Sequence, residues 1–261
     1  MTISSQIAAH TSPTVVPLVK LGDGELVLSG DNTYTTGTYV YGGTLTLEKV
    51  GEKGTLATGS TVTVDGSTSV LAGHGDILGY GSKTVGTVNL QNGGTLYNDS
   101  TDAHVTVGAA VNMNHGFITV DENAAGTNYG NFVFDNAINV TGGTDNEISA
   151  NLITLRQFGG TPGDAGGKIS VVDGSKLTIS SVIRADGVPL VKSGAGELVL
   201  TETNTYGTGT TVSDGKITLK NSGTLGTGAV VNDALIEFAQ NNDVAIPSAI
   251  SGTGSDRKSV V

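Results

Sequence analysis

The feature that most constrains this chain is a long segment that occurs twice. The segment PLVKLGDGELVLSGDNTYTTGTYVYGGTLTLE, from Pro17 to Glu48, returns late in the chain as PLVKSGAGELVLTETNTYGTGTTVSDGKITLK, from Pro189 to Lys220. Twenty of the 32 aligned positions are identical, and the alignment needs no gap. Self-similarity of this kind indicates that one structural unit has been used more than once, so it decides the architecture before any local pattern does.

The retained residues fall into two chemical groups. Apolar residues alternate with polar ones, which is typical of strands with one buried face, and Gly and Asn mark the turns between them. No group that suggests catalysis is retained with them. The positions that we expect to hold the repeated unit together are Leu26, Leu28, Asn32, Tyr34, Val40 and Leu47 in the first copy, and Leu198, Leu200, Asn204, Tyr206, Val212 and Leu219 in the second.

Short alternating segments follow one another without a helical pattern between them, which leaves a sandwich, a barrel or a solenoid. A sandwich does not explain a gap-free repeat between segments that lie so far apart in the chain. Stacked coils do, because one coil cannot bury its apolar face alone. We therefore expect an all-β solenoid of about eleven coils, each of roughly 20 to 24 residues if it holds three short strands and their turns.

The retained polar residues have structural interpretations. We expect Asn32 and Asn204 to bond nearby backbone, in a left-handed conformation that Asn tolerates. Tyr34 and Tyr206 are expected to pack over the adjoining coil with the hydroxyl in water.

The two copies also retain a lysine that is followed closely by a glutamate. These are Lys20 with Glu25, and Lys192 with Glu197. We expect them to form ion pairs, which contribute only about 0 to 1 kcal/mol when exposed.

The pattern K-x-G-x-G-x-L-x-L, N-T-Y, G-T-x-V, G-x-L-T-L resembles the autotransporter-associated β-strand repeat of Gram-negative autotransporter passenger domains. Both copies carry it nearly whole, with Ile217 in place of the usual Leu. The resemblance implies a right-handed parallel β-helix of the single-stranded, pectin-lyase-like type. It also implies export to the cell surface or outer membrane, or secretion, in a Gram-negative bacterium. It does not imply an activity.

The same resemblance suggests the boundaries. The extended copies cover residues 17–64 and 189–231 of a β-helix at 17–254, which we expect to be an open-ended fragment. Residues 1–16 are polar and aperiodic, as in a frayed end or the remnant of a preceding coil. The final segment, 255–261, breaks with the pattern and is expected to be a non-native tail.

Composition excludes several partners. The net charge is −11, and the chain has no cysteine and only three arginines, Arg156, Arg184 and Arg257. No basic stripe is present that could neutralise phosphates, so nucleic acid is not an expected partner. Contact with a membrane is expected only through a C-terminal β-barrel, which the family carries and this segment lacks.

The sequence gives little support for a metal site or for a serine-protease active site. A serine-protease passenger needs Ser, His and Asp together, and no matching serine accompanies His10, His74, His104 or His115. The segment GHGDILGYG, residues 73–81, fits the calcium-binding β-roll repeat poorly and occurs once. We expect no cofactor and no metal.

A β-helix enzyme that degrades polysaccharides is the alternative function, and it would need paired acids. The candidate pairs lie in turns, where each acid has a simpler explanation as a turn former. They are Asp99 with Asp102, Asp121 with Glu122, and Asp145 with Glu147.

Three interruptions of the strand pattern, Asp121–Gly130, Thr141–Glu147 and Arg156–Gly167, are candidate binding loops. The third carries Phe158 and Asp164. We expect a non-catalytic stalk or adhesive surface that acts in aggregation, biofilm or host attachment. Its expected partners are host or bacterial surface glycans or proteins, and further copies of the chain.

Overall fold

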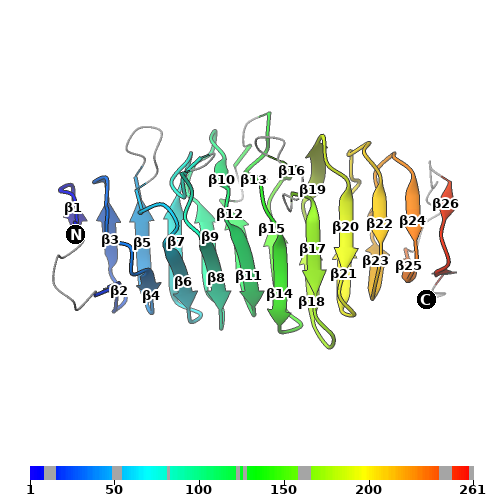
Figure 1. Ribbon diagram of the computed structural model, residues 1–261, viewed down its shortest axis with the longest axis horizontal. Coiled ribbons are helices and arrows are strands. Elements are labelled where there is room, and N and C mark those ends of the chain that lie inside the picture. The colour runs from blue at the N-terminus through cyan, green and yellow to red at the C-terminus, as the bar shows by residue number, and fades with distance from the viewer. Residues whose placement is uncertain are drawn as a thin grey trace.

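The structure is a computed structural model that describes residues 1–8, 16–48, 55–80, 83–121, 124–125, 128–157, 166–240 and 249–258. Every regular element in these residues is a β-strand, and all pairs of strands are parallel. None of the described residues belongs to a helix that could cross a membrane. The strands stack along the long axis of an elongated solenoid (Figure 1).

Sheet A runs the length of the solenoid with twelve strands. In order, these are β1 (Thr2–Ile3), β3 (Glu25–Leu28), β5 (Gly43–Leu47), β7 (Ser69–Gly73), β9 (Thr95–Asn98), β12 (Phe117–Val120), β15 (Asn146–Ser149), β18 (Lys176–Ile179), β21 (Glu197–Leu200), β23 (Lys216–Lys220), β25 (Leu235–Ala239) and β27 (Ser255–Lys258).

Sheet B has eleven strands, and sheet C has four. Sheet B contains β2 (Leu18–Lys20), β4 (Thr38–Val40), β6 (Thr61–Asp65), β8 (Thr87–Gln91), β11 (Ala110–Asn114), β14 (Ile138–Gly142), β17 (Lys168–Val171), β20 (Leu190–Ser193), β22 (Thr210–Val212), β24 (Val230–Asn232) and β26 (Ile250–Ser251). Sheet C contains β10 (Val105–Val107), β13 (Phe132–Phe134), β16 (Leu152–Arg156) and β19 (Val182–Asp186).

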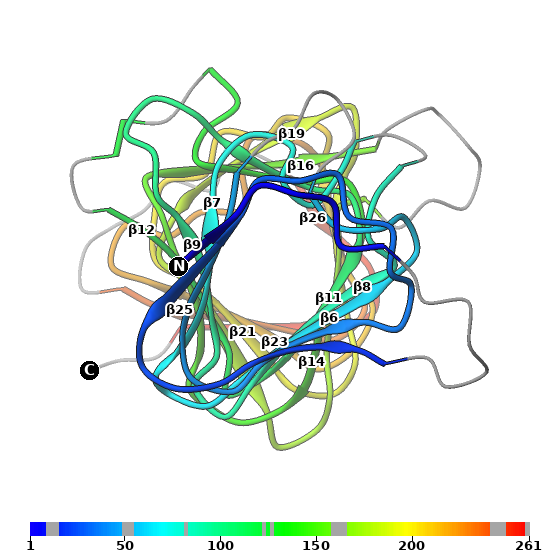
Figure 2. The same cartoon turned by 90° about the vertical axis from the view of Figure 1, so that its left-hand side faces the viewer.

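Each coil passes from a strand of sheet B around a tight corner to a strand of sheet A, and returns along the third side. Figure 2 looks along the axis and shows successive coils superimposed around one interior. Coils at the repeats are short, since the partner of Thr210 in the next coil is Val230. Middle coils are longer, since the partner of Ile138 in the next coil is Ile169. The expected coil length is therefore wrong for the middle, where coils add sheet C and its loops.

The corner between sheets B and A explains the retained glycines. Gly43 and Gly215 both have positive φ, +61° and +70°. A Cβ on either would lie 2.4 Å from a carbonyl oxygen of the preceding coil, that of Gly24 or of Gly194. Only glycine permits both the conformation and the approach.

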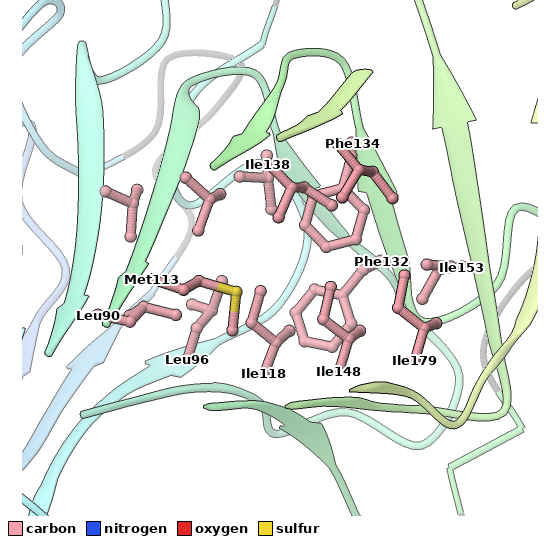
Figure 3. Packing of buried hydrophobic residues seen from close by; sticks show 14 of the residues in the cluster. Leu90, Leu96, Met113, Ile118, Phe132, Phe134, Ile138, Ile148, Ile153 and Ile179 are labelled. Atoms are coloured by element: carbon pink, nitrogen blue, oxygen red, sulfur yellow. The ribbon is translucent and has the colours of Figure 1, made fainter. Parts of the chain in front are cut away.

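The interior is one continuous apolar column. Alternation places Leu45 and Leu47 inside while Thr44 and Thr46 point outward. Figure 3 shows the middle of this column, where sheet C adds Phe132 and Phe134, whose stacked rings lie 6.0 Å apart between centroids. Opposite them, the strands of sheet A contribute one buried residue per coil in register: Leu96, Ile118, Ile148 and Ile179.

The expected inward residues lie in this column. Leu28, Val40, Leu198, Leu200 and Val212 are fully buried, Leu47 and Leu219 nearly so, and Leu26 is half-buried against the core. The segment Thr141–Glu147, expected to be a loop, is instead a short corner between β14 and β15.

Both ends of the described chain continue the stack. β1 pairs with β3, so the described residues 1–8 form part of the coil before β3. β27 pairs with β25, so Ser255–Lys258 extends sheet A. Backbone bonds at a sheet edge accept almost any sequence, which is why β27 pairs although all its side chains are exposed.

The column makes a stability prediction at Leu200. We expect Leu200→Asp to lower the free energy of unfolding by more than about 3 kcal/mol, because it removes core contacts and buries a charge without a partner. Denaturant or thermal unfolding measures the change. Val231→Asp, on the exposed outer side of β24, is the matched control and should shift stability by about 0.5 kcal/mol or less. Equal melting of Leu200→Asp and the parent would show that Leu200 does not face the core.

Candidate functional site

Asn32 and Asn204 act as clamps between coils. The Oδ1 atom of Asn32 accepts a bond from the backbone N–H of Ile7 at 2.8 Å, and its Nδ2 donates to the carbonyl of Thr55 at 2.9 Å. Asn204 makes the same pair of contacts in the second copy, to coils on both sides. Among the described residues, only Asn92, His115 and Asn221 have positive φ without being glycine. The expected left-handed conformation of Asn32 and Asn204 is therefore wrong, while their bonds to backbone are confirmed.

Tyr34 and Tyr206 are buried, so the expectation of a hydroxyl in water is also wrong. The Tyr34 hydroxyl lies 2.8 Å from the hydroxyl of Thr38, and that of Tyr206 lies 2.9 Å from Thr210. Burial raises the pKa of both phenols above their usual value. Each buried hydroxyl needs a partner in the interior, and the threonine that follows on the next strand supplies it.

Lys20 and Lys192 do not pair with Glu25 and Glu197, so that expectation is wrong. Both are buried, Lys192 completely. The Nζ of Lys192 donates to the carbonyls of Ser193, Gly194 and Asp214 at 2.9, 2.6 and 3.1 Å. Lys20 binds the equivalent carbonyls of Leu21, Gly22 and Gly42 in the first copy.

The lysine therefore binds the corners of two successive coils together. Its three donors match three carbonyls that face the interior, which satisfies the hydrogen bonds of the ammonium group without a direct ion pair. Burial lowers the pKa of Lys192 to about 8, and the charge of Asp214 opposes this shift. The glutamates that follow bond elsewhere: Glu25 accepts from Thr46, and Glu197 accepts from Thr218 and pairs with Lys216.

The candidate acids have separate partners: Asp99, Asp102 and Asp145 are exposed outside the strands, while Glu147, expected in a turn, lies partly buried in β15. Asp99 pairs with His74 at 2.6 Å, and Asp145 with His115 at 2.5 Å. Asp102 accepts a hydrogen bond from Ser100, and Glu147 accepts one from Ser180.

In the described part of the chain, no group of three or more His, Cys, Asp or Glu could hold a metal ion. His10 and Glu122 lie outside the described residues.

The densest set of functional side chains lies on the outer face of sheet C. We call Tyr80, Tyr129, Asp135, Arg156 and Arg184 the sheet C cluster. Arg156 forms a two-point ion pair with Asp135, at 2.7 and 3.0 Å. Its guanidinium lies 5.8 Å from the Tyr80 ring and 5.9 Å from the Tyr129 ring, while that of Arg184 lies 5.4 Å from Tyr129.

This cluster fastens lateral loops to the solenoid. Beneath it, the outward-facing Thr106, Val133 and Thr154 are buried, although they lie outside the core. Two of the expected binding loops contribute, through Tyr129 and Arg156, and no sequence pattern indicated that Tyr80 would join them. Phe158 and Asp164, in the third loop, lie outside the described residues. The interactions within the cluster indicate a stabilising role.

A second outer feature, which sequence reasoning missed, is a row of amides on sheet B. The Nδ2 of Asn139 donates to Oδ1 of Asn112 at 3.0 Å, and the Nδ2 of Asn112 donates to Asn89 at 2.9 Å. The Nδ2 of Asn89 donates in turn to the Thr63 hydroxyl at 3.2 Å. We call Asn139, Asn112 and Asn89, together with Thr63 at the end of the row, the amide row. The recurrence of V-N-L, V-N-M and I-N-V at residues 88–90, 111–113 and 138–140 was the available signal.

The repeated unit resembles a known family of repeats. The passenger-associated-transport-repeat matches residues 18–47 and 190–219. These two segments are therefore similar to passenger-associated transport repeats, the name used for them below. Each repeat begins with a sheet B strand that carries the buried lysine, and then turns the corner into a sheet A strand. It continues through the clamping asparagine and ends on the sheet A strand of the next coil. No curated protein and no solved structure matches the chain. The passenger-associated transport repeats indicate an autotransporter passenger with a β-helix, and the family implies export in Gram-negative bacteria.

The lysine of the second passenger-associated transport repeat predicts a pH dependence. The unfolded chain keeps the Lys192 proton up to about pH 10.5, while the folded chain releases it near pH 8. The titration of Lys192 therefore contributes stability that is fully present above pH 10.5 and is lost as the pH falls through 8. Relative to Lys192→Met, the parent should gain up to about 3 kcal/mol between these values. Urea titrations across that range measure it, with exposed Lys220→Met as the control. Parallel stability curves for the parent and Lys192→Met would contradict the prediction.

The sheet C cluster makes a separate prediction. Arg156→Met leaves the buried carboxylate of Asp135 without its cation, which costs about 3 to 5 kcal/mol. We expect faster amide hydrogen exchange in β13 and β16 and little change in β21 and β23. Adding Asp135→Asn should restore part of the protection, because it removes the unpaired charge. Unchanged exchange in Arg156→Met would show that the pair does not hold this region.

Proposed function

We propose that the chain is a non-catalytic segment of an exported passenger, which acts as a rigid stalk with an adhesive outer surface. The observation that carries this proposal is the continuity of sheet A from β1 to β27. Twelve strands at about 4.8 Å spacing extend about 50 Å. A stack of this length with a dry core holds its outer side chains in fixed rows, as a spacer and binding surface requires.

Arrangement of the outer groups supports adhesion over catalysis. An open hollow of about 350 Å³ includes Lys176, Glu197 and Lys216 among its lining residues. Lys216 lies 3.0 Å from both Glu197 and Glu237, and ion pairing and hydrogen bonds lower the pKa of Glu197 despite its burial. A glycosidase acid needs a raised pKa, so this carboxylate is a poor candidate for that role. The polysaccharide-degrading enzyme is therefore the weaker proposal.

Adhesion can be tested with beads that carry the purified chain. We expect coated beads to attach to cells and to one another more than albumin-coated beads do, because the rows of outer side chains are presented at many copies per bead. The same protein, incubated with neutral and uronate-containing polysaccharides, should release no reducing ends and no unsaturated products.

Two results would count against this function. Attachment equal to that of albumin-coated beads would remove the adhesive role. Cleavage that is reproducible and proportional to protein concentration would establish the enzyme instead.

A further inference from the structure

The two passenger-associated transport repeats provide an internal comparison, because they share a backbone and, among other positions, differ on the outer face of sheet B. On the outer face of sheet B, the first copy has Leu21, Tyr39 and Tyr41. At the aligned positions the second copy has Ser193, Thr211 and Ser213. The buried lysine, the clamping asparagine and the inward Leu28 and Leu47 are the same in both copies.

The first copy therefore exposes apolar side chains that the fold does not require. Leu21 is 69% exposed and Tyr41 49%, and they lie beside Val19, which is 44% exposed and is retained as Val191 in the second copy. The rings of Tyr39 and Tyr41 are near parallel, with an interplanar angle of 15° and centroids 6.0 Å apart. We call Val19, Leu21, Tyr39 and Tyr41 the tyrosine patch. Since the second copy forms the same strands with Ser193, Thr211 and Ser213, folding does not require Leu21, Tyr39 and Tyr41, and an exposed apolar group of this kind is a candidate binding surface.

The amide row continues directly from this patch. Tyr39 pairs with Thr63, which pairs with Asn89, then Asn112 and Asn139. The bonds within the row use one amide hydrogen of each Asn, so each side chain retains a second donor, and its oxygen retains a lone pair. Aromatic rings and spaced amides thus lie in one line parallel to the solenoid axis.

This strip carries little charge on a molecule whose net charge is −11. The outward residues of β4, β6, β8 and β11 are Tyr, Thr, Asn, Gln and Ala, apart from Asp65. Asp65 accepts a bond from Asn92 at 2.8 Å. An anionic polymer would be repelled by the surrounding charge, whereas a neutral polymer rich in hydroxyl groups meets matching donors and acceptors.

We propose that the tyrosine patch and amide row bind a neutral polysaccharide that lies along the solenoid. Sugar rings pack their apolar C–H faces on Tyr39 and Tyr41, and their hydroxyls bond the amides of Asn89 and Asn112. The inference rests on the proposed adhesive function and names its partner. Tyrosine suits this role because its ring supplies contact area and its hydroxyl supplies a hydrogen bond.

The test converts the first copy's surface into that of the second. The triple variant Leu21→Ser, Tyr39→Thr, Tyr41→Ser should keep the melting behaviour of the parent, because these residues already occupy the same backbone positions in the second copy. Native gels cast with dextran, mannan or galactomannan measure binding as retardation, with polygalacturonate as the anionic comparison. We expect at least one neutral polymer to retard the parent, and the triple variant to bind it at least tenfold more weakly.

The control variant is Val172→Ser with Val231→Ser, which removes exposed apolar side chains elsewhere and should bind like the parent. Equal retardation of parent and triple variant, or no retardation by any neutral polymer, would overturn the inference. So would stronger retardation by polygalacturonate than by the neutral polymers. If the triple variant loses only concentration-dependent self-association, the occupant is a second copy of the chain and the inference is wrong. The bead assay decides the adhesive function independently of all these outcomes.

Discussion

The coils of the two repeats depend on the satisfaction of backbone groups at their corners. Along the strands, parallel neighbours pair the backbone, but at the corners carbonyls and N–H groups point into a dry interior where an unpaired group costs about 1 to 3 kcal/mol. Lys192 binds three such carbonyls and Asn204 binds one N–H and one carbonyl of the coils on either side. The repeated lysine and asparagine are therefore part of the backbone hydrogen-bond network, and their polar groups are occupied by these bonds.

The inward pattern was predictable because it obeys two simple rules. Alternation assigns Leu28 and Leu200 to the core, and the repeat establishes that coils are stacked. The polar interior was not predictable in the same way. Lys20 and Lys192 looked like partners of Glu25 and Glu197, since their short separation in the sequence suggests proximity. The intervening corner turns the lysine inward, and no local pattern encodes that.

The outer sites were less accessible for a related reason. The sheet C cluster joins Tyr80, Tyr129 and Arg156 through coils whose lengths differ from one another, so sequence separation does not indicate contact. The amide row is different, because V-N-L, V-N-M and I-N-V stand at the same place in three strands of sheet B. Knowledge of the register converts that recurrence into a row. Without the register it is only three asparagines in three apolar segments.

Inner and outer residues are thus under separate constraints. An inward residue must fit between the residues above and below it, so Leu26 in one copy corresponds to Leu198 in the other. An outward residue meets solvent and its two neighbours in a row, and polar or apolar residues both allow the strand to form. Tyr39 and Thr211 occupy equivalent positions on β4 and β22, with the same pairing to the coils on either side. Differences between the copies on this face therefore carry information about binding that differences in the core cannot carry, because core differences are limited by packing.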